Sequence, residues 1–308
     1  MPFPTPPDVA PPDVAVILIL RAPGDTADAV LAALAAQPEA AGFAVILVDG
    51  QPDPPPDAPL TLPPWVIHLR APGLNMPQLK ARGIAATNAT ALAFLEPKAV
   101  PAPGWAAALI RARAAAPEAA LGGTVRFAGR GTAADQAAFI FEYAEFSAAQ
   151  LQSGRTRDLP GNNMVLPRAA LLAHCGDILA GEGLNKPFCQ ARLTAAGVPL
   201  QLVPGMAVAM TTAHRLAGLL SSRMRYARCF GGTRLALASP GQRWRYRLGA
   251  PAVPVLVLAK RMRAASRAET GPRRPFTLPT LALLCLAWAA GEIAGSWRGP
   301  GRSCEQLY

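Results

Sequence analysis

The chain has 308 residues, of which 51% are hydrophobic, and its formal net charge is +11. This length allows one large domain or two modest ones, and the hydrophobic content excludes a disordered chain. The charge is uneven, because residues 215–308 carry 16 Lys and Arg against 3 Asp and Glu, whereas residues 1–214 carry 14 against 16. The basic charge therefore accompanies the most apolar part of the chain, which favours a membrane surface over a nucleic acid as its partner.

The N-terminal part alternates apolar strands with helices, after a Pro-rich tail expected at residues 1–13. Two continuous β-branched runs, residues 14–20 and 43–48, are typical of strands that are buried on both faces of a sheet. This alternation predicts an α/β fold with a doubly wound, mostly parallel sheet, whose ligands bind beyond the carboxyl ends of the strands. The other elements expected here are a helix over 25–37, a short strand at 65–69, a helix over 81–87 and a strand at 92–95.

The middle of the chain is predicted to be mostly helical. Gly122-Gly123 and the run Pro160-Gly161-Asn162-Asn163 are expected to form loops. After His214 the character changes, because Arg-rich helical segments lead to an uncharged stretch of 17 residues at 275–291.

That uncharged stretch is a candidate membrane segment. As a helix it spans about 25 Å, just short of a hydrocarbon core of ~30 Å. Basic residues flank it on both sides, which favours a segment that lies in the membrane interface over a clean crossing. A hairpin of helices buried inside a soluble fold is the alternative. The flanking cations are Arg273, Arg274, Arg298 and Arg302, and the aromatic residues suited to the headgroup level are Trp244, Tyr246, Trp288 and Trp297.

The cysteines and the N-terminus bear on the compartment. The chain has 5 Cys, and none of them is spaced C-x-x-C, so neither a disulfide framework nor a zinc site is expected. A reducing compartment is then the default. The first residues lack a basic region followed by an apolar one, so they do not predict a signal peptide, and most of the chain is expected in the cytoplasm.

Several charged residues follow predicted strands or open predicted helices. Asp49 ends the second strand, where a carboxylate can accept hydrogen bonds from a ribose or a base edge, although an Asp-Gly turn needs no ligand. Lys80 and Arg82 are candidates to pair with a diphosphate, or they simply open a solvated helix. Glu96 follows the strand at 92–95 and is a candidate ligand for a divalent cation that bridges phosphates. Lys98 is a candidate to contact a phosphate without a metal. For both Glu96 and Lys98, the alternative is a loop with no ligand.

Polar residues later in the chain are also candidates. Asn162 and Asn163 can hydrogen-bond a sugar hydroxyl, although Asn-rich turns are often structural. Glu182 is flanked by glycines and is a candidate base, with an exposed loop carboxylate as the alternative. His214 follows a Thr-Thr pair. A single histidine with no other metal ligand nearby in the sequence is more often structural than metal-binding.

Taken together, the order of these segments resembles a family-two glycosyltransferase with the GT-A fold. The resemblance covers about residues 14–230, and its most specific stretches are KARGIAATNATALAFLEPKAVPAPGW and LPGNNMVLPRAAL. The run from Trp288 to Gly295 also resembles the ending W-A-x-G-E-x-x-G of a bacterial subgroup.

The resemblance implies an activity and a domain order. It implies a transferase domain at 14–230 and a basic, apolar extension of membrane-associated helices at 231–308. Such enzymes move a sugar from a nucleotide-sugar donor to a lipid-linked or polysaccharide acceptor, with inversion at the anomeric carbon. The implied setting is cell-envelope or exopolysaccharide assembly at the cytoplasmic face of the bacterial inner membrane.

The family's functional positions fall on named residues of this chain. Asp49 matches the acid that contacts the donor's base or ribose, and Lys80 falls where the family usually has an Arg facing the nucleotide. Residues 96–98 fall on the acidic motif that binds Mg or Mn, of which only Glu96 is kept. Asn185 and Lys186 fall on the segment that normally carries the catalytic carboxylate.

Two interpretations follow from these departures. In the first, Lys98 and Lys186 neutralise the diphosphate directly, and Glu182 takes over as the base. In the second, the chain is a catalytically inactive homologue that binds a sugar nucleotide or a partner at the membrane surface. A nucleic-acid binder is disfavoured, because the Arg-rich third lacks a groove-reading motif.

Overall fold

A computed structural model describes residues 13–21, 25–52, 62–128, 131–147, 153–236, 238–267 and 275–306. Apart from Asp13, the tail predicted at residues 1–13 therefore lies outside the described residues. The chain forms two compact units. We call Met1–Arg126 with Leu151–Met210 the sheet unit, and Phe127–Gln150 with Thr211–Tyr308 the helical unit. Residues 127–150 and 211–230 thus belong to the same compact unit as the C-terminal helices.

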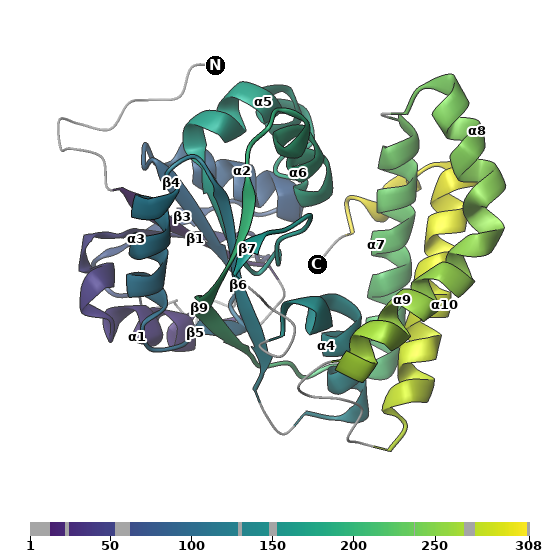
Figure 1. Ribbon diagram of the computed structural model, residues 1–308, viewed down its shortest axis with the longest axis horizontal. Coiled ribbons are helices and arrows are strands. Elements are labelled where there is room, and N and C mark those ends of the chain that lie inside the picture. Colours follow the sequence, from purple (N-terminus) through teal and green to yellow (C-terminus); the bar gives the residue numbers. More distant parts are fainter. Residues whose placement is uncertain are drawn as a thin grey trace. The chain divides into compact units, whose positions relative to one another are not determined.

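The described part of the sheet unit is built on nine strands in the order β3-β2-β1-β4-β8-β6-β9-β5, with β7 paired to β9 (Figure 1). The α/β fold is confirmed. The sheet is parallel from β3 through β4, whereas β8 runs antiparallel to β4 and β6, so the antiparallel share is larger than predicted. The strands are β1 (Val14–Leu20), β2 (Ala44–Asp49), β3 (Val66–Arg70), β4 (Ala91–Leu95), β5 (Ala99–Pro101), β6 (Ala120–Phe127), β7 (Gly154–Arg155), β8 (Asn163–Pro167) and β9 (Leu200–Met210).

Helices cover both faces of this sheet (Figure 1). Alternate β1 residues, Ala15, Ile17 and Ile19, share one core cluster with apolar residues of α2, α5 and α6. Helices α1 and α3 lie on the other face. The helices of this unit are α1 (Asp28–Ala35), α2 (Met76–Ala85), α3 (Trp105–Ala115), α5 (Arg168–Gly181) and α6 (Lys186–Ala195), with a short 3-10 turn η1 (Pro38–Gly42).

Helix α2 begins at Met76, five residues before the start predicted from the sequence. The Asn75 side chain accepts a hydrogen bond from Gln78 N at 3.0 Å, and the Gln78 side chain accepts one from Asn75 N at 3.0 Å. This reciprocal capping box satisfies two donors at the helix start. Lys80 therefore lies inside α2, about one turn from its N-terminus.

The prediction of a mostly helical middle region, with a loop at Gly122-Gly123, is wrong, because both glycines lie in β6. A Cβ atom on Gly123 would overlap the Met206 carbonyl oxygen and the side-chain amide of Asn163. The glycine therefore permits a close approach inside the sheet rather than a turn. The loop predicted at Pro160 is present, and β8 begins directly after it at Asn163.

The helical unit packs α10 against α4, α7 and α9. Its core cluster contains Leu219 of α7 and Leu281, Leu284 and Cys285 of α10. The helices are α4 (Ala133–Tyr143), α7 (Leu216–Ala236), α8 (Pro240–Gly249), α9 (Val253–Arg267) and α10 (Thr277–Arg298), with 3-10 turns η2 (Ala144–Phe146), η3 (Ala250–Ala252) and η4 (Gly301–Ser303).

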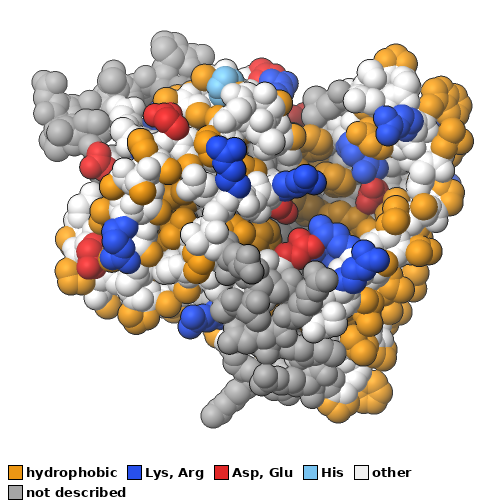
Figure 2. All heavy atoms as spheres, in the orientation of Figure 1, with side chains coloured by type: hydrophobic (Ala, Val, Ile, Leu, Met, Phe, Trp, Pro, Cys, Tyr) orange, Lys and Arg blue, Asp and Glu red, His pale blue; other side chains and the backbone are white. Residues whose placement is uncertain are grey.

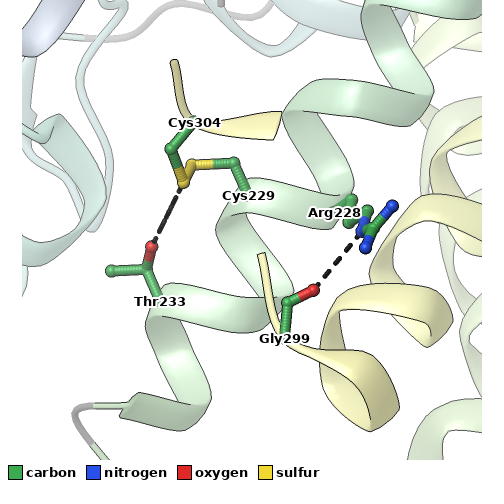
Figure 3. The surroundings of a disulfide bond; sticks show 5 residues. All are labelled: Arg228, Cys229, Thr233, Gly299 and Cys304. Atoms are coloured by element: carbon green, nitrogen blue, oxygen red, sulfur yellow. Dashed lines mark hydrogen bonds between the residues drawn. A yellow bond between two sulfur atoms is a disulfide. The ribbon is translucent and has the colours of Figure 1, made fainter. Parts of the chain in front are cut away.

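The expectation that the cysteines form no disulfide is wrong. Cys229 of α7 is bonded to Cys304, just after η4 (Figure 3). Thr233 Oγ1 lies 3.8 Å from Cys304 Sγ, and Arg228 Nε donates a hydrogen bond to Gly299 O at 3.3 Å. These contacts hold the C-terminal segment to α7. Disulfides persist in oxidising environments, so the cysteine pattern no longer supports a reducing compartment.

Thiol titration tests this bond. Unfolded protein that has not been reduced is expected to expose three thiols, from Cys175, Cys189 and Cys285, and to expose five after reduction. In the native state these three thiols are buried and should react slowly, and burial raises the pKa of Cys285 to about 11. As a check against oxidation during purification, cells are lysed in denaturant with an alkylating reagent and no reductant. Five alkylated cysteines in that sample would show that the bond is absent.

Candidate functional site

Charged side chains gather at the carboxyl ends of the four parallel strands. Arg21 follows β1, Asp49 ends β2, Arg70 ends β3 and Glu96 follows β4. Because the carboxyl ends of parallel strands meet at one edge of a sheet, these four residues lie along the same edge. Ligands of open α/β sheets bind at this edge.

Asp49 is nearly buried, with 5% of its surface exposed, and its neighbours orient its carboxylate. Oδ2 accepts a hydrogen bond from Arg70 Nη1 at 2.5 Å and lies 3.5 Å from His68 Nε2, while Oδ1 accepts one from Gln51 N at 2.9 Å. The side chains of Arg70 and His68 are each about a third exposed. A nucleotide at this strand end would therefore meet Arg70 and His68 together with Asp49.

Asp25 connects the loops that follow three strands. Its carboxylate lies 3.7 Å from Lys98 Nζ, after β4, and accepts a hydrogen bond from Arg21 N, after β1, at 3.4 Å. Its carbonyl oxygen accepts one from Gln51 Nε2, after β2, at 3.0 Å. Lys98 is half exposed, so its ammonium group lies at the surface of this edge.

Lys80, Glu96 and Lys186 form a cluster of charges near the end of β4. Lys80 is half-buried. Burial lowers the pKa of its amine, the Glu96 carboxylate opposes that shift, and the positive charge of Lys186 adds to it. Glu96 and Lys186 thus both lie near enough to Lys80 to act on its charge. We call these three side chains the lysine–glutamate cluster.

Lys186 is the first residue of α6 and is held by an ion pair. Its Nζ lies 2.6 Å from Asp158 Oδ1, and the same oxygen accepts hydrogen bonds from Leu159 N at 2.9 Å and Gln190 Nε2 at 3.1 Å. The stem of Lys186 passes Gly161, where an added Cβ would lie 3.6 Å from Lys186 Cδ. Lys186 is therefore positioned by Asp158 beside the turn that precedes β8.

The segment before α6 docks on the start of α2. Leu184 N donates a hydrogen bond to Pro77 O at 2.8 Å. Gly183 has φ +82°, and an added Cβ would overlap the backbone of Pro77 and Gln78. Only glycine fits both constraints. This contact joins the helix that carries Lys80 to the segment that leads to Lys186.

The two asparagines predicted to bind a sugar are fully buried. Asn163 accepts a hydrogen bond from Trp105 Nε1 at 3.0 Å and donates to Met206 O at 2.7 Å and to Thr124 O at 3.1 Å. All the polar atoms of its side chain are thus used inside the fold, and we assign Asn163 a structural role. Asn162 Nδ2 donates to Met210 Sδ at 3.4 Å, and its Oδ1 has no partner among the described residues.

No described contact brings the candidates Arg82 and Glu182 into the lysine–glutamate cluster, nor His214, which the sequence favours as structural. Arg82 is exposed on α2, and residues two apart on a helix do not share a face, so it points away from Lys80. Glu182 is exposed at the C-cap of α5, next to Gly183. His214 belongs to the helical unit, where its backbone N donates to Asp135 Oδ1 at 2.6 Å.

These residues do not fit a resident divalent cation. A hard cation takes several oxygen ligands, yet Glu96 is the single acid of residues 96–98. The positive charge of Lys80 lies near this acid, that of Lys186 lies near Lys80, and both would repel a metal ion. In the part of the chain that the structure describes, no group of three or more His, Cys, Asp or Glu is placed to hold a metal. The cations at this edge include the three lysines Lys80, Lys98 and Lys186, together with Arg21 and Arg70.

The sequence patterns missed five residues of this edge: Arg21, Asp25, His68, Arg70 and Asp158. Arg70 carries a detectable signal, since it is a charged residue at the end of a predicted strand, like Asp49. Asp158 carries no local signal, because its partner Lys186 lies 28 residues further along the chain.

No protein-family model matches the sequence, and no curated protein matches it either. Among solved structures, the chain is similar to the mannosyltransferase PcManGT from Pyrobaculum calidifontis, solved in complex with GDP-Man and Mn2+. The TM-score is 0.56 at 16% identity, over 96% of this chain and 91% of that chain. This similarity shows that the chain has the α/β fold of GT-A glycosyltransferases.

Two further solved structures are more distant. GalNAc-T7 with UDP, GalNAc and Mn2+ has a TM-score of 0.46 at 12% identity, over 68% of this chain and 45% of that chain. S. aureus TarS 1-349 in complex with UDP has a TM-score of 0.47 at 12% identity, over 92% of this chain and 90% of that chain. Neither is close enough to inform the site.

Proposed function

We propose that this protein is a glycosyltransferase that binds a nucleotide-sugar donor at the carboxyl edge of its parallel strands. The sugar passes to a lipid-linked or saccharide acceptor, with inversion at the anomeric carbon. The observation that carries the proposal is the lysine–glutamate cluster at the end of β4, in a fold shared with a transferase solved with GDP-Man.

The chemistry of sugar transfer requires this kind of cluster. The departing nucleoside diphosphate gains negative charge as the glycosidic bond breaks, and fixed positive charge at that point stabilises the transition state. Lys80 and Lys186 are two such charges, and Lys98 is a third at the same edge. Because Lys186 is the first residue of α6, the positive end of the helix dipole also favours an anion there. We infer that these lysines take the part that a divalent cation takes in metal-dependent transferases.

Glu182 is the carboxylate that we propose as the base for the acceptor hydroxyl. It is exposed and lies beside Gly183, which packs on the first turn of α2. Glu182→Gln is expected to lower kcat by about 100-fold or more while leaving the Kd for the nucleotide unchanged, because general-base catalysis contributes ~10²–10⁴-fold. Glu118→Gln, at another exposed glutamate of the sheet unit, should leave kcat unchanged. A Glu182→Gln variant with full kcat would exclude Glu182 as the base.

A second candidate function rests on the ion pair between Lys186 and Asp158. The resemblance places a catalytic carboxylate near Lys186, and a lysine cannot accept a proton from the acceptor while it is charged. The chain would then be a non-catalytic homologue that binds a sugar nucleotide and presents it, or a partner, at a membrane. Binding of a nucleotide sugar without turnover supports this candidate.

The cellular setting is also a proposal. We place the reaction in cell-envelope or exopolysaccharide assembly at the cytoplasmic face of a bacterial inner membrane. The bond between Cys229 and Cys304 argues against this compartment, because disulfides are rare in a reducing environment. Support comes from the balance of 16 basic against 3 acidic residues in 215–308.

A panel of UDP-, GDP- and dTDP-sugars tests the proposed function. Purified full-length chain is incubated with each donor, with manganese or with EDTA, and released nucleoside diphosphate is measured alongside binding by calorimetry. The transferase proposal predicts binding and slow hydrolysis or transfer of at least one donor in both conditions. Absence of binding for every donor would contradict both candidate functions.

A further inference from the structure

Helix α10 has an unusual distribution of side chains. Its outward side carries Leu283, Leu286, Ala290 and Trp297, which are exposed and recur at helical spacing. Its inward side carries Gly291 and Gly295, where an added Cβ would overlap backbone oxygens of α7, and the buried Glu292. The inner side also carries Leu281, Leu284 and Cys285, so α10 is apolar on both sides. A helix on the surface of a water-soluble unit is expected to be polar on its outer side.

The charge of Glu292 is satisfied inside the helical unit. Its carboxylate lies 2.8 Å from Arg234 Nη1 and accepts a hydrogen bond from Trp288 Nε1 at 2.8 Å. The Arg234 guanidinium in turn lies 4.4 Å from the centre of the Tyr246 ring. An ion pair turned inward and an apolar surface turned outward is the arrangement that lipid favours.

Neighbouring helices extend the outward apolar surface. Helices α8 and α9 both contact α10. Figure 2 shows hydrophobic side chains gathered over the outer side of these helices. We call the exposed apolar side chains of α8, α9 and α10 the apolar face, and those that are more than half exposed include Trp244, Leu248, Val255, Leu256, Leu286 and Trp297.

Cations border the apolar face. The Arg247 guanidinium lies 5.6 Å from the ring centre of Trp297 and 6.0 Å from that of Trp244. Arg243 and Arg247 also line an open hollow of about 270 Å³ beside Trp297. Exposed tryptophans next to arginines suit the headgroup level of a bilayer, where the rings meet both the acyl chains and the polar layer.

We propose that the apolar face lies in the interface of an anionic lipid bilayer. The charge of this part of the chain favours anionic lipid, because residues 215–308 carry 16 basic against 3 acidic residues. It disfavours a second copy of the same face, because a dimer would bring like charges together. Helix α10 is long and apolar enough to span a membrane, at 22 residues and a mean hydropathy of 1.5, but it packs on α4, α7 and α9, so 44% of its most apolar window is buried. An interfacial helix keeps those contacts, whereas a lone span would lose them.

Vesicle co-sedimentation of the full chain tests this proposal, which does not depend on transferase activity. Binding to phosphatidylcholine vesicles containing 30% phosphatidylglycerol is expected to exceed binding to pure phosphatidylcholine at least tenfold, and to fall in high salt. The double variant L283E/L286E should reduce binding at least tenfold. Leu172→Glu, on α5, is the matched control, since Leu172 and Leu283 are both 44% exposed, and it should bind as the wild type does.

Three outcomes would overturn the proposal. The wild type could stay in the supernatant with the anionic vesicles, or L283E/L286E could bind as the wild type does. A stable dimer that L283E/L286E dissociates, without any vesicle binding, would assign the apolar face to a second copy. Circular dichroism of each variant checks that these surface changes leave the fold intact.

Discussion

Replacing Lys80 with alanine is expected to weaken the binding of the preferred nucleoside diphosphate by about 10- to 150-fold, because a hydrogen bond to a charged group contributes about 1.5–3 kcal/mol. Lys80 is half-buried, so its ammonium group is poorly solvated without a ligand and gains more from an anion than an exposed lysine does. Lys186→Ala should give a loss of the same order. Calorimetric titration with UDP and GDP measures both.

Two comparisons make the Lys80 result specific. Arg111→Ala removes an exposed cation from α3 and should leave the affinity within about twofold, since surface charges contribute little. Lys80→Arg keeps the charge and should retain part of the affinity. Equal affinities for Lys80→Ala and the wild type would remove Lys80 from the site.

The same amine gives the binding a defined pH dependence. Burial lowers the pKa of Lys80 from its usual 10.5, so the amine loses its proton at a lower pH than an ordinary lysine. Because an anion favours the protonated amine, affinity should fall as pH rises through that lowered pKa, and binding there should take up protons. Glu96→Gln removes the charge that opposes the shift, so the fall should move to lower pH. Titrations in buffers of different ionisation enthalpy measure the proton uptake.

Gly183→Ala is expected to destabilise the sheet unit by about 3 kcal/mol or more and to abolish nucleotide binding. The backbone at Gly183 has φ +82°, which costs an L-residue about 1–2 kcal/mol, and the new Cβ would also overlap the backbone of Pro77 and Gln78. Relief of that overlap must move the segment that leads to Lys186 away from the helix that carries Lys80. Urea unfolding and nucleotide titration measure the two effects.

The chain offers a matched control for this glycine. Gly197 has φ +83°, but an added Cβ there would meet nothing within 4 Å. Gly197→Ala should therefore show only the conformational cost, about 1–2 kcal/mol, with unchanged nucleotide affinity. If the two variants lose equal stability and both bind nucleotide normally, the contact between Gly183 and α2 does not position the site.

Much of the parallel half of the sheet could be predicted from the sequence. The runs that form β1, β2 and β4 are apolar without interruption, because these strands are buried on both faces. The antiparallel half was missed. Gly122-Gly123 looks like a loop, yet Gly123 is required by the approach of Met206 from a distant strand, which no local pattern reveals.

The site shows the same division. The positions of Asp49 and Glu96 at the ends of strands could be predicted, since each ends or follows an apolar run. The setting of Lys186 could not, because its partner Asp158 and the contact of the preceding segment with Pro77 are both distant in sequence. The bond between Cys229 and Cys304 escaped prediction for the same reason, as 75 residues separate the two cysteines.

The central claim is that lysine side chains, rather than a resident cation, neutralise the diphosphate. Calorimetric titration of the full chain with nucleoside diphosphate, in excess EDTA and again in manganese, tests it most directly. The account predicts the same affinity, within about threefold, in both conditions, and loss of that affinity in the double variant K80A/K186A. Binding that disappears in EDTA and returns with manganese would contradict it.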